Sequence, residues 1–225
     1  MTAALARLPF ARLTRGVAAW VTTGAWTMLA FAVAIIARAR GAVHGADLVL
    51  VGTVGALVLP LLAYGLVGAA IGGRSLSTSG ASLVAFGAAP ASAAAVTIAI
   101  AAVGCAAAGA FVAAGVALVA HGLADPAPAG DALASAYVGA LGGGAYACWF
   151  SLGATFGRRG GGRALFLVAD WVLGTTAGAI LTPRAHLLTL LGGPSATHLS
   201  GRSSSVALVF LAGACALMAA KRCRT

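Results

Sequence analysis

Six long apolar runs dominate this sequence and restrict the folds open to it. They cover residues 17–37, 48–71, 93–120, 132–157, 164–182 and 205–220. The chain has 14 basic and 4 acidic residues, and of all these only Asp170 lies inside a run. A helix needs about 20 apolar residues to cross the roughly 30 Å hydrocarbon core of a bilayer. The pattern therefore predicts an all-α, polytopic membrane protein with six transmembrane helices, as a single transmembrane domain over residues 1–225.

The composition argues against several other classes of protein. A soluble domain carries about 25% charged residues, whereas this chain carries 8% and has a mean hydropathy of +1.02. The net charge of +10 does not indicate nucleic-acid binding, because the basic residues form short clusters between apolar runs. The four cysteines lack the CxxC spacing of a zinc site or disulfide framework. We expect no cofactor.

The basic residues are divided unevenly between the two sets of connecting segments. The N-terminal tail, residues 72–92, residues 158–163 and the C-terminal tail together hold ten of them, and the other segments hold four. Segments rich in Lys and Arg stay on the cytoplasmic side of a membrane. The sequence therefore predicts that both the N-terminus and the C-terminus are cytoplasmic.

The apolar runs contain pairs of glycines four residues apart. These pairs are Gly68/Gly72, Gly139/Gly143 and Gly174/Gly178. Small residues at this spacing lie on one helix face and let two helix backbones approach closely in lipid. We expect these pairs to mark packing contacts.

The segment between the second and third runs is neither a clean span nor a simple turn. On a helical wheel its apolar residues and glycines share one arc, namely Leu76, Gly80, Leu83, Val84, Phe86 and Gly87. Arg74 lies on the opposite, polar arc. This pattern predicts a cytoplasmic interfacial helix over about 74–88 that ends before Pro90. A polar loop followed by an early start of the third span is the alternative.

Asp170 is the one acid inside a run, and it has two interpretations. A charged residue within a span is costly and marks a candidate functional site. In the functional interpretation Asp170 lies on a transport pathway. In the structural one it pairs with Arg159 or Arg163, which lie close to it along a helix. The four histidines fall in predicted outer loops, where we expect them to be solvent-exposed and not to bind metal.

The layout resembles the membrane subunit of type-2 ABC exporters (the ABC-2 permease family). The matching stretches are residues 60–92, with a turn, a small helix and a proline before the long third span; residues 151–171, where a span ends in a basic turn; and the outer segment 183–200. The resemblance implies six spans, a coupling helix at 74–88 and a re-entrant outer segment at 183–200. It also implies a dimer of identical or different permease subunits in the bacterial cytoplasmic (inner) membrane.

The same resemblance implies a soluble ATP-binding partner. The residues expected to contact it are Arg74, Leu76, Leu83, Val84 and Phe86. The chain has no GxxxxGK[ST] phosphate-binding loop, so we expect it to catalyse nothing itself. One departure from the family lies in the N-terminal tail, where Pro9 and the scattered arginines argue against an amphipathic helix.

Two other functions remain open at this stage. The chain could be a non-transporting membrane scaffold or assembly protein, because such a protein needs no chemically reactive residues. Thr78-Ser79-Gly80 also resembles the serine motif of rhomboid intramembrane proteases, with His198 as a distant match to their histidine. The predicted topology places Ser79 and His198 on opposite sides of the bilayer, too far apart for a catalytic pair.

Overall fold

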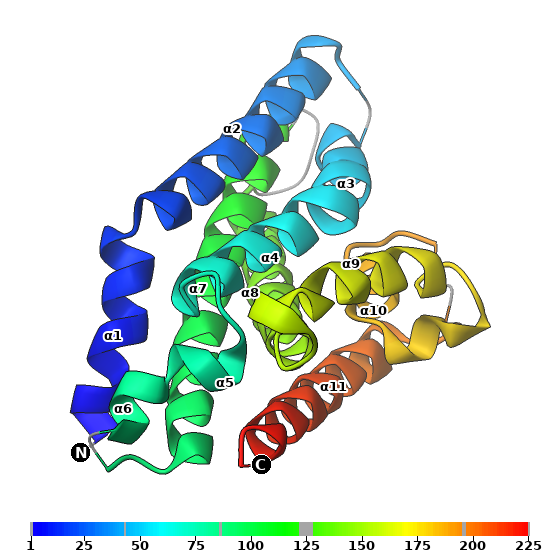
Figure 1. Cartoon of the computed structure of the whole chain (residues 1–225). Coiled ribbons are helices and arrows are strands. Elements are labelled where there is room, and N and C mark those ends of the chain that lie inside the picture. Colours follow the sequence, from blue (N-terminus) through cyan, green and yellow to red (C-terminus); the bar gives the residue numbers. More distant parts are fainter. Residues whose placement is uncertain (1, 43, 86, 122–127, 195–196, 225) are drawn as a thin grey trace.

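The structure is a computed structural model that describes residues 2–42, 44–85, 87–121, 128–194 and 197–224. Within these ranges the chain forms helices and turns and no strand (Figure 1). Four helices in this part of the chain are long and apolar enough to cross a membrane: α2 (Val17–Ala39), the continuous helix Gly45–Ala70, α7 (Pro90–Ala120) and α11 (Gly201–Arg222). The prediction of an all-α chain with membrane-spanning helices is confirmed to this extent.

The continuous helix Gly45–Ala70 has three parts. It begins as α3 (Gly45–Val49), widens into the π-helix η1 (Leu50–Val58) and ends as α4 (Leu59–Ala70). The chain then forms two short helices, α5 (Leu76–Ser79) and α6 (Ala81–Ala85), before α7.

The fourth and fifth predicted spans differ from the other four. α8 (Pro128–Gly153) is one helix of 26 residues, rich in glycine, and is not among the four helices long and apolar enough to cross a membrane. The fifth run is not one helix, because α9 (Gly162–Leu173) ends within it and the 3₁₀ helix η3 (Ala177–Leu181) follows a turn. Twelve helical residues extend about 18 Å, well short of a bilayer core. The count of six spans therefore stays a prediction.

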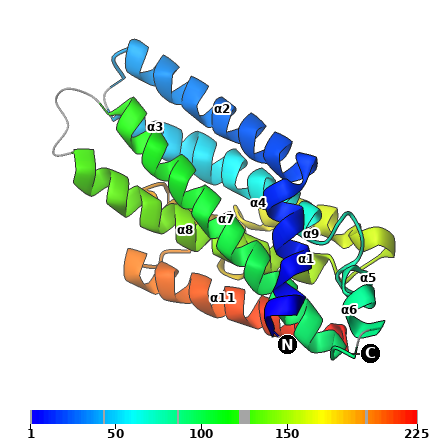
Figure 2. The same ribbon diagram turned by 90° about the vertical axis from the view of Figure 1, so that its left-hand side faces the viewer.

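The long helices run side by side, and different segments of the chain lie at the two ends of the bundle (Figures 1 and 2). Both chain termini lie at one end, together with α5 and α6. The connection between α2 and α3 lies at the opposite end. The common location of the termini agrees with a cytoplasmic position for both, and their side of the membrane stays a prediction.

The N-terminal tail is helical, although Pro9 and the scattered arginines argued against an amphipathic helix there. α1 (Thr2–Arg15) contains Pro9 and packs against α7 (Figure 2). The chain bends between α1 and α2 at Gly16, where a Cβ would overlap the carbonyl oxygen of Arg12. Glycine at position 16 therefore allows α1 to pack beside the bundle.

The closest backbone contact in the bundle lies between α7 and α8. A Cβ on Gly139 would overlap the carbonyl oxygen of Gly109, and a Cβ on Gly143 would overlap that of Cys105. The Gly139/Gly143 pair therefore lies in a helix contact, as predicted. Gly72 and Gly174 lie at the ends of α4 and α9, and the nearby side chains of other helices at these two glycines are those of Arg12 and Arg184.

The short helix α10 (Pro183–Leu190) lies buried between longer helices. Leu187 is fully buried and faces Gly142 of α8, where a Cβ would lie 2.6 Å from its side chain. Leu191 faces Gly55 of η1 in the same way, at 2.7 Å. α10 occupies the segment for which a re-entrant helix is predicted, and its depth in the membrane stays a prediction.

We expect Gly139→Ala and Gly143→Ala to push α7 and α8 apart and to destabilise the protein. Overpacking of a tight contact costs about 1–3 kcal/mol. Thermal unfolding in detergent measures the loss. Gly144→Ala is the matched control, because its Cβ would lie 4.0 Å from the nearest side chain. Equal midpoints for Gly139→Ala, Gly144→Ala and the wild type would contradict this account.

Candidate functional site

A buried polar network joins α8, α9, α10 and η1. The Tyr146 hydroxyl donates a hydrogen bond to Oδ2 of Asp170 at 2.9 Å, and the Arg184 backbone N–H donates to Oδ1 at 3.1 Å. Nη1 of Arg184 donates to the Ala56 carbonyl oxygen at 2.8 Å. Asp170 and Tyr146 are both 0% exposed. The one acid inside the apolar runs is therefore fully enclosed by protein.

Asp170 caps the N-terminus of α10. The first N–H groups of a helix have no partner within it, and Thr182 at the N-cap position makes no capping bond because its hydroxyl donates to the Ala179 carbonyl. Pro183 follows and has no N–H, so the first free donor belongs to Arg184. A carboxylate is the favoured partner at a helix N-terminus, and Asp170 of another helix supplies it.

Arg184 donates to a backbone carbonyl that residue 60 cannot bind, because residue 60 is proline. Proline lacks the N–H that would bind the carbonyl four residues earlier, and its ring crowds that carbonyl. Here that carbonyl belongs to Ala56, at the end of the wide η1 segment. Local widening of a helix is frequent at functional sites. The π-segment and α10 are therefore joined through one guanidinium group.

Arg163 does not pair with Asp170, in contrast to the ion pair considered from the sequence. Its Nη1 donates to the Tyr64 carbonyl and its Nε to the Gly160 carbonyl, both at 3.3 Å. Its guanidinium also lies over the Tyr64 ring, 5.1 Å from the ring centre. The sequence identified Asp170 but not its partners. The sequence feature that points to Arg184 is Pro60, because a proline in a helix has no N–H for the carbonyl four residues earlier, which Arg184 binds here.

The network is a structural connection between four helical elements. The described residues contain no group of three or more His, Cys, Asp or Glu that could hold a metal ion. His186 is fully buried near this region, with Nε2 2.9 Å from the Ile180 carbonyl oxygen. The expectation that the histidines are solvent-exposed was therefore wrong for His186.

The predicted coupling helix is two short helices separated at Gly80. Ser75 caps the first of them by accepting a hydrogen bond from the Thr78 N–H at 3.3 Å. Leu76 is 1% exposed and packs inside the bundle, so it is not available to a partner. The other predicted contact residues are accessible in part: Arg74 is exposed, and Leu83 and Val84 are half-buried. Phe86 lies outside the described residues.

The start of α5 and the turn after α8 form a basic cleft. The cleft has a volume of about 460 Å³ and is lined by Arg74, Ser75, Thr78, Gly157 and Arg159. The Leu76 N–H donates to the Ala154 carbonyl at 3.1 Å and ties α5 to the end of α8. Two exposed arginines and two hydroxyls suit an acidic group of a partner. Arg159 was not among the contact residues expected from the sequence.

Ser79 does not have the surroundings of a protease nucleophile. It is buried, and its hydroxyl donates to the Leu76 carbonyl at 2.8 Å. Within the part of the chain that the structure describes, no histidine forms a hydrogen bond with it. A serine nucleophile needs an adjacent base, so nothing at Ser79 favours the protease alternative.

Comparison with protein-family models gives no match, and neither the curated proteins nor the solved structures include a significant one. The fold and the network therefore define the protein only by class. It is an all-helical membrane protein with a buried Asp–Tyr–Arg network and a basic cleft at the end that holds both termini.

We expect Tyr146→Phe to destabilise the fold, because Asp170 loses one of its two hydrogen-bond donors inside the protein. Leaving a buried polar group without its partner costs about 1–3 kcal/mol. Denaturation in mixed micelles measures the change in the free energy of unfolding. Tyr137→Phe is the control, since Tyr137 is 60% exposed. Equal effects of the two substitutions would show that the hydrogen bond contributes nothing.

The link between Pro60 and Arg184 can be tested with a double-mutant cycle. Arg184→Met leaves the Ala56 carbonyl without a donor, and we expect a loss of about 1–3 kcal/mol. In the Pro60→Ala background the new N–H can reach that carbonyl, so Arg184→Met should cost less. Exposed Arg202 provides the control, with additive effects of Arg202→Met and Pro60→Ala. The same loss for Arg184→Met in both backgrounds would refute the link.

Proposed function

We propose that this chain is the membrane subunit of an ATP-driven export system in the bacterial cytoplasmic membrane. In this proposal it binds no ATP and moves an unidentified substrate. The observation that carries the proposal is the basic cleft between Arg74 and Arg159, at the same end of the bundle as both termini. A soluble ATPase that binds there would contact α5, the segment that the resemblance assigns to coupling.

The contacts of α5 support a route from the cleft to the buried network. α5 is hydrogen-bonded to the end of α8 through Leu76 and Ala154. α8 carries Tyr146, which holds Asp170, and Asp170 holds the start of α10. A movement of α5 would therefore reach the helices around the network. In a permease, such a movement would bias the equilibrium between inward-open and outward-open states.

A dimer of permease subunits belongs to the same proposal. Many large apolar side chains on α2, α7 and α11 are exposed, among them Trp20, Met28, Phe111 and Phe210. Lipid and a second subunit can both cover such a surface. The transport pathway of the proposed exporter would lie between the two subunits.

The proposal predicts that an ATPase copurifies with this chain. The tagged protein is extracted from its native host in mild detergent, and its partners are identified by mass spectrometry. We expect a protein with a phosphate-binding loop, and we expect Arg74→Glu with Arg159→Glu to release it by repelling its acidic groups. The double variant must keep the elution volume and unfolding midpoint of the wild type.

Arg40→Glu with Arg202→Glu is the matched control, since it reverses two exposed charges away from the cleft. This control should retain the ATPase. If no ATPase copurifies with the wild type, or if both double variants retain it equally, the exporter proposal fails. The scaffold alternative then becomes the better interpretation.

A further inference from the structure

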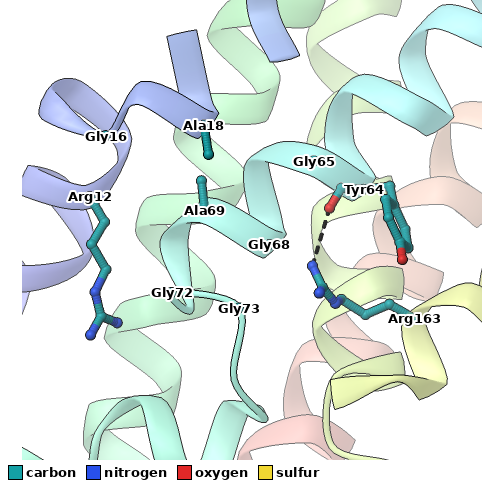
Figure 3. A pocket seen from close by; sticks show the side chains of 10 residues that line it. All are labelled: Arg12, Gly16, Ala18, Tyr64, Gly65, Gly68, Ala69, Gly72, Gly73 and Arg163. Carbon is teal, nitrogen blue, oxygen red and sulfur yellow. Dashed lines mark hydrogen bonds between the residues drawn. The ribbon is translucent and has the colours of Figure 1, made fainter. Parts of the chain in front are cut away.

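A second basic cavity lies between α1, α2, α4 and α9, and it differs in character from the cleft at α5. Its volume is about 460 Å³, with Arg12 and Arg163 at its sides. Figure 3 shows the two arginines on either side of the last turns of α4. The wall formed by α4 and the turn after it consists mostly of small residues, Gly65, Gly68, Ala69 and Gly72, with Tyr64 at one end. The cavity therefore combines two cations with a smooth, largely apolar wall.

The glycines of α4 give this cavity its shape. A Cβ on Gly68 would overlap Nη1 of Arg163, so Arg163 can lie against the backbone of α4 only because residue 68 is glycine. Gly72 has a φ of 66° and turns the chain away at the end of α4, and a Cβ there would lie 3.1 Å from the Arg12 guanidinium. The absence of side chains at Gly68 and Gly72 leaves the space beside α4 that the two arginines occupy.

Neither arginine has an acidic partner among the described residues. Arg12 donates to the Ala70 carbonyl at 3.3 Å, and Arg163 donates to two other backbone carbonyls. Of the described acids, Asp170 lies in the buried network, and Asp47 and Asp131 line a separate cavity with the ends of α7 and α10. An arginine has five N–H donors, so each guanidinium keeps donors for a ligand.

The electrostatics of this cavity favour an anion. Burial, and next the nearby charge of Arg74, lower the pKa of Arg12 below its usual value, and burial lowers the pKa of Arg163. Both shifts mean that the positive charges are partly removed from water without a compensating negative charge. A bound anion would supply that charge.

The depth of the cavity indicates what kind of anion fits. Its rim lies at the Gly72–Gly73 turn and at Gly16, where α4 ends and α2 begins. Its inner end lies at Tyr64, six residues before the end of α4, which is about 9 Å deeper along the helix. A small free ion would use only the arginines. A phospholipid would place its anionic headgroup near the arginines and its upper acyl chain along the apolar wall.

We infer that this cavity binds the headgroup of an anionic phospholipid, with Arg12 and Arg163 as the cations that attract it. Arginine binds phosphate oxygens in pairs through its planar fork of donors. Basic pockets between membrane helices on the cytoplasmic side bind lipid headgroups. The inference does not depend on an ATPase partner, because the cavity at α5 is a different one.

The test compares retention of two lipids by native mass spectrometry. The full chain is purified in mixed micelles that contain equal amounts of dioleoylphosphatidylglycerol and dioleoylphosphatidylcholine. We expect the wild type to retain phosphatidylglycerol preferentially, and we expect Arg12→Gln with Arg163→Gln to weaken that retention at least about tenfold. A tenfold change corresponds to 1.4 kcal/mol, less than one hydrogen bond to a charged group.

The matched control is Arg38→Gln with Arg40→Gln. It removes the same number of charges from the opposite end of the bundle, where Nη1 of Arg38 also donates to a backbone carbonyl, that of Val119, at 3.4 Å. This variant should retain phosphatidylglycerol as the wild type does. Arg12→Gln alone serves if the double variant does not fold, because Arg12 makes only one hydrogen bond in the structure; it should also retain less.

Two outcomes overturn the inference. One is equal retention of the two lipids by the wild type, or retention of phosphatidylglycerol that the Arg12 and Arg163 substitutions leave unchanged. The other concerns the source of the phosphate. If inorganic phosphate raises the unfolding midpoint of the wild type as much as short-chain phosphatidylglycerol does, the site binds a free phosphate group and not a lipid.

Discussion

The close contact between the backbones of α7 and α8 is the constraint on which the rest of the structure depends. Helices in lipid gain little from burying apolar surface against each other, so contact at short distance must hold them together. Gly109, Gly139 and Gly143 allow that contact. On α8, Tyr146 binds Asp170 of α9, and Gly142 leaves space for Leu187 of α10. The position of the buried network follows from this helix pair.

The network itself joins polar groups that come from different helices. Pro60 has no N–H to donate to the Ala56 carbonyl, and the N-cap residue of α10 makes no capping hydrogen bond. Asp170 is fully buried. Arg184 donates to both Ala56 and Asp170, and Tyr146 completes the carboxylate. In an apolar environment each unsatisfied group costs several kcal/mol. These hydrogen bonds therefore join four helical elements, α8, α9, α10 and η1.

The end of the bundle that holds both termini carries two basic cavities with different surroundings. The cleft at Arg74 and Arg159 is lined with hydroxyls and lies on α5, so it suits a soluble acidic partner. The cavity at Arg12 and Arg163 runs along the apolar wall of α4, so it suits a lipid. The structure divides between two cavities arginines that the sequence presents only as a charge asymmetry.

The sequence by itself determined the membrane class, three of the long spans nearly to their ends, the Gly139/Gly143 contact and the presence of a single acid, Asp170, inside the apolar runs. These follow from hydropathy and spacing, which are properties of a single segment. Tertiary structure alone decided that Leu76 faces inward, that the fifth run breaks at Gly174, and that Asp170 binds Tyr146 and Arg184 instead of Arg163. Hydropathy reports whether a residue avoids water, and it does not report which neighbour it meets. That choice depends on how helices far apart in the sequence pack together.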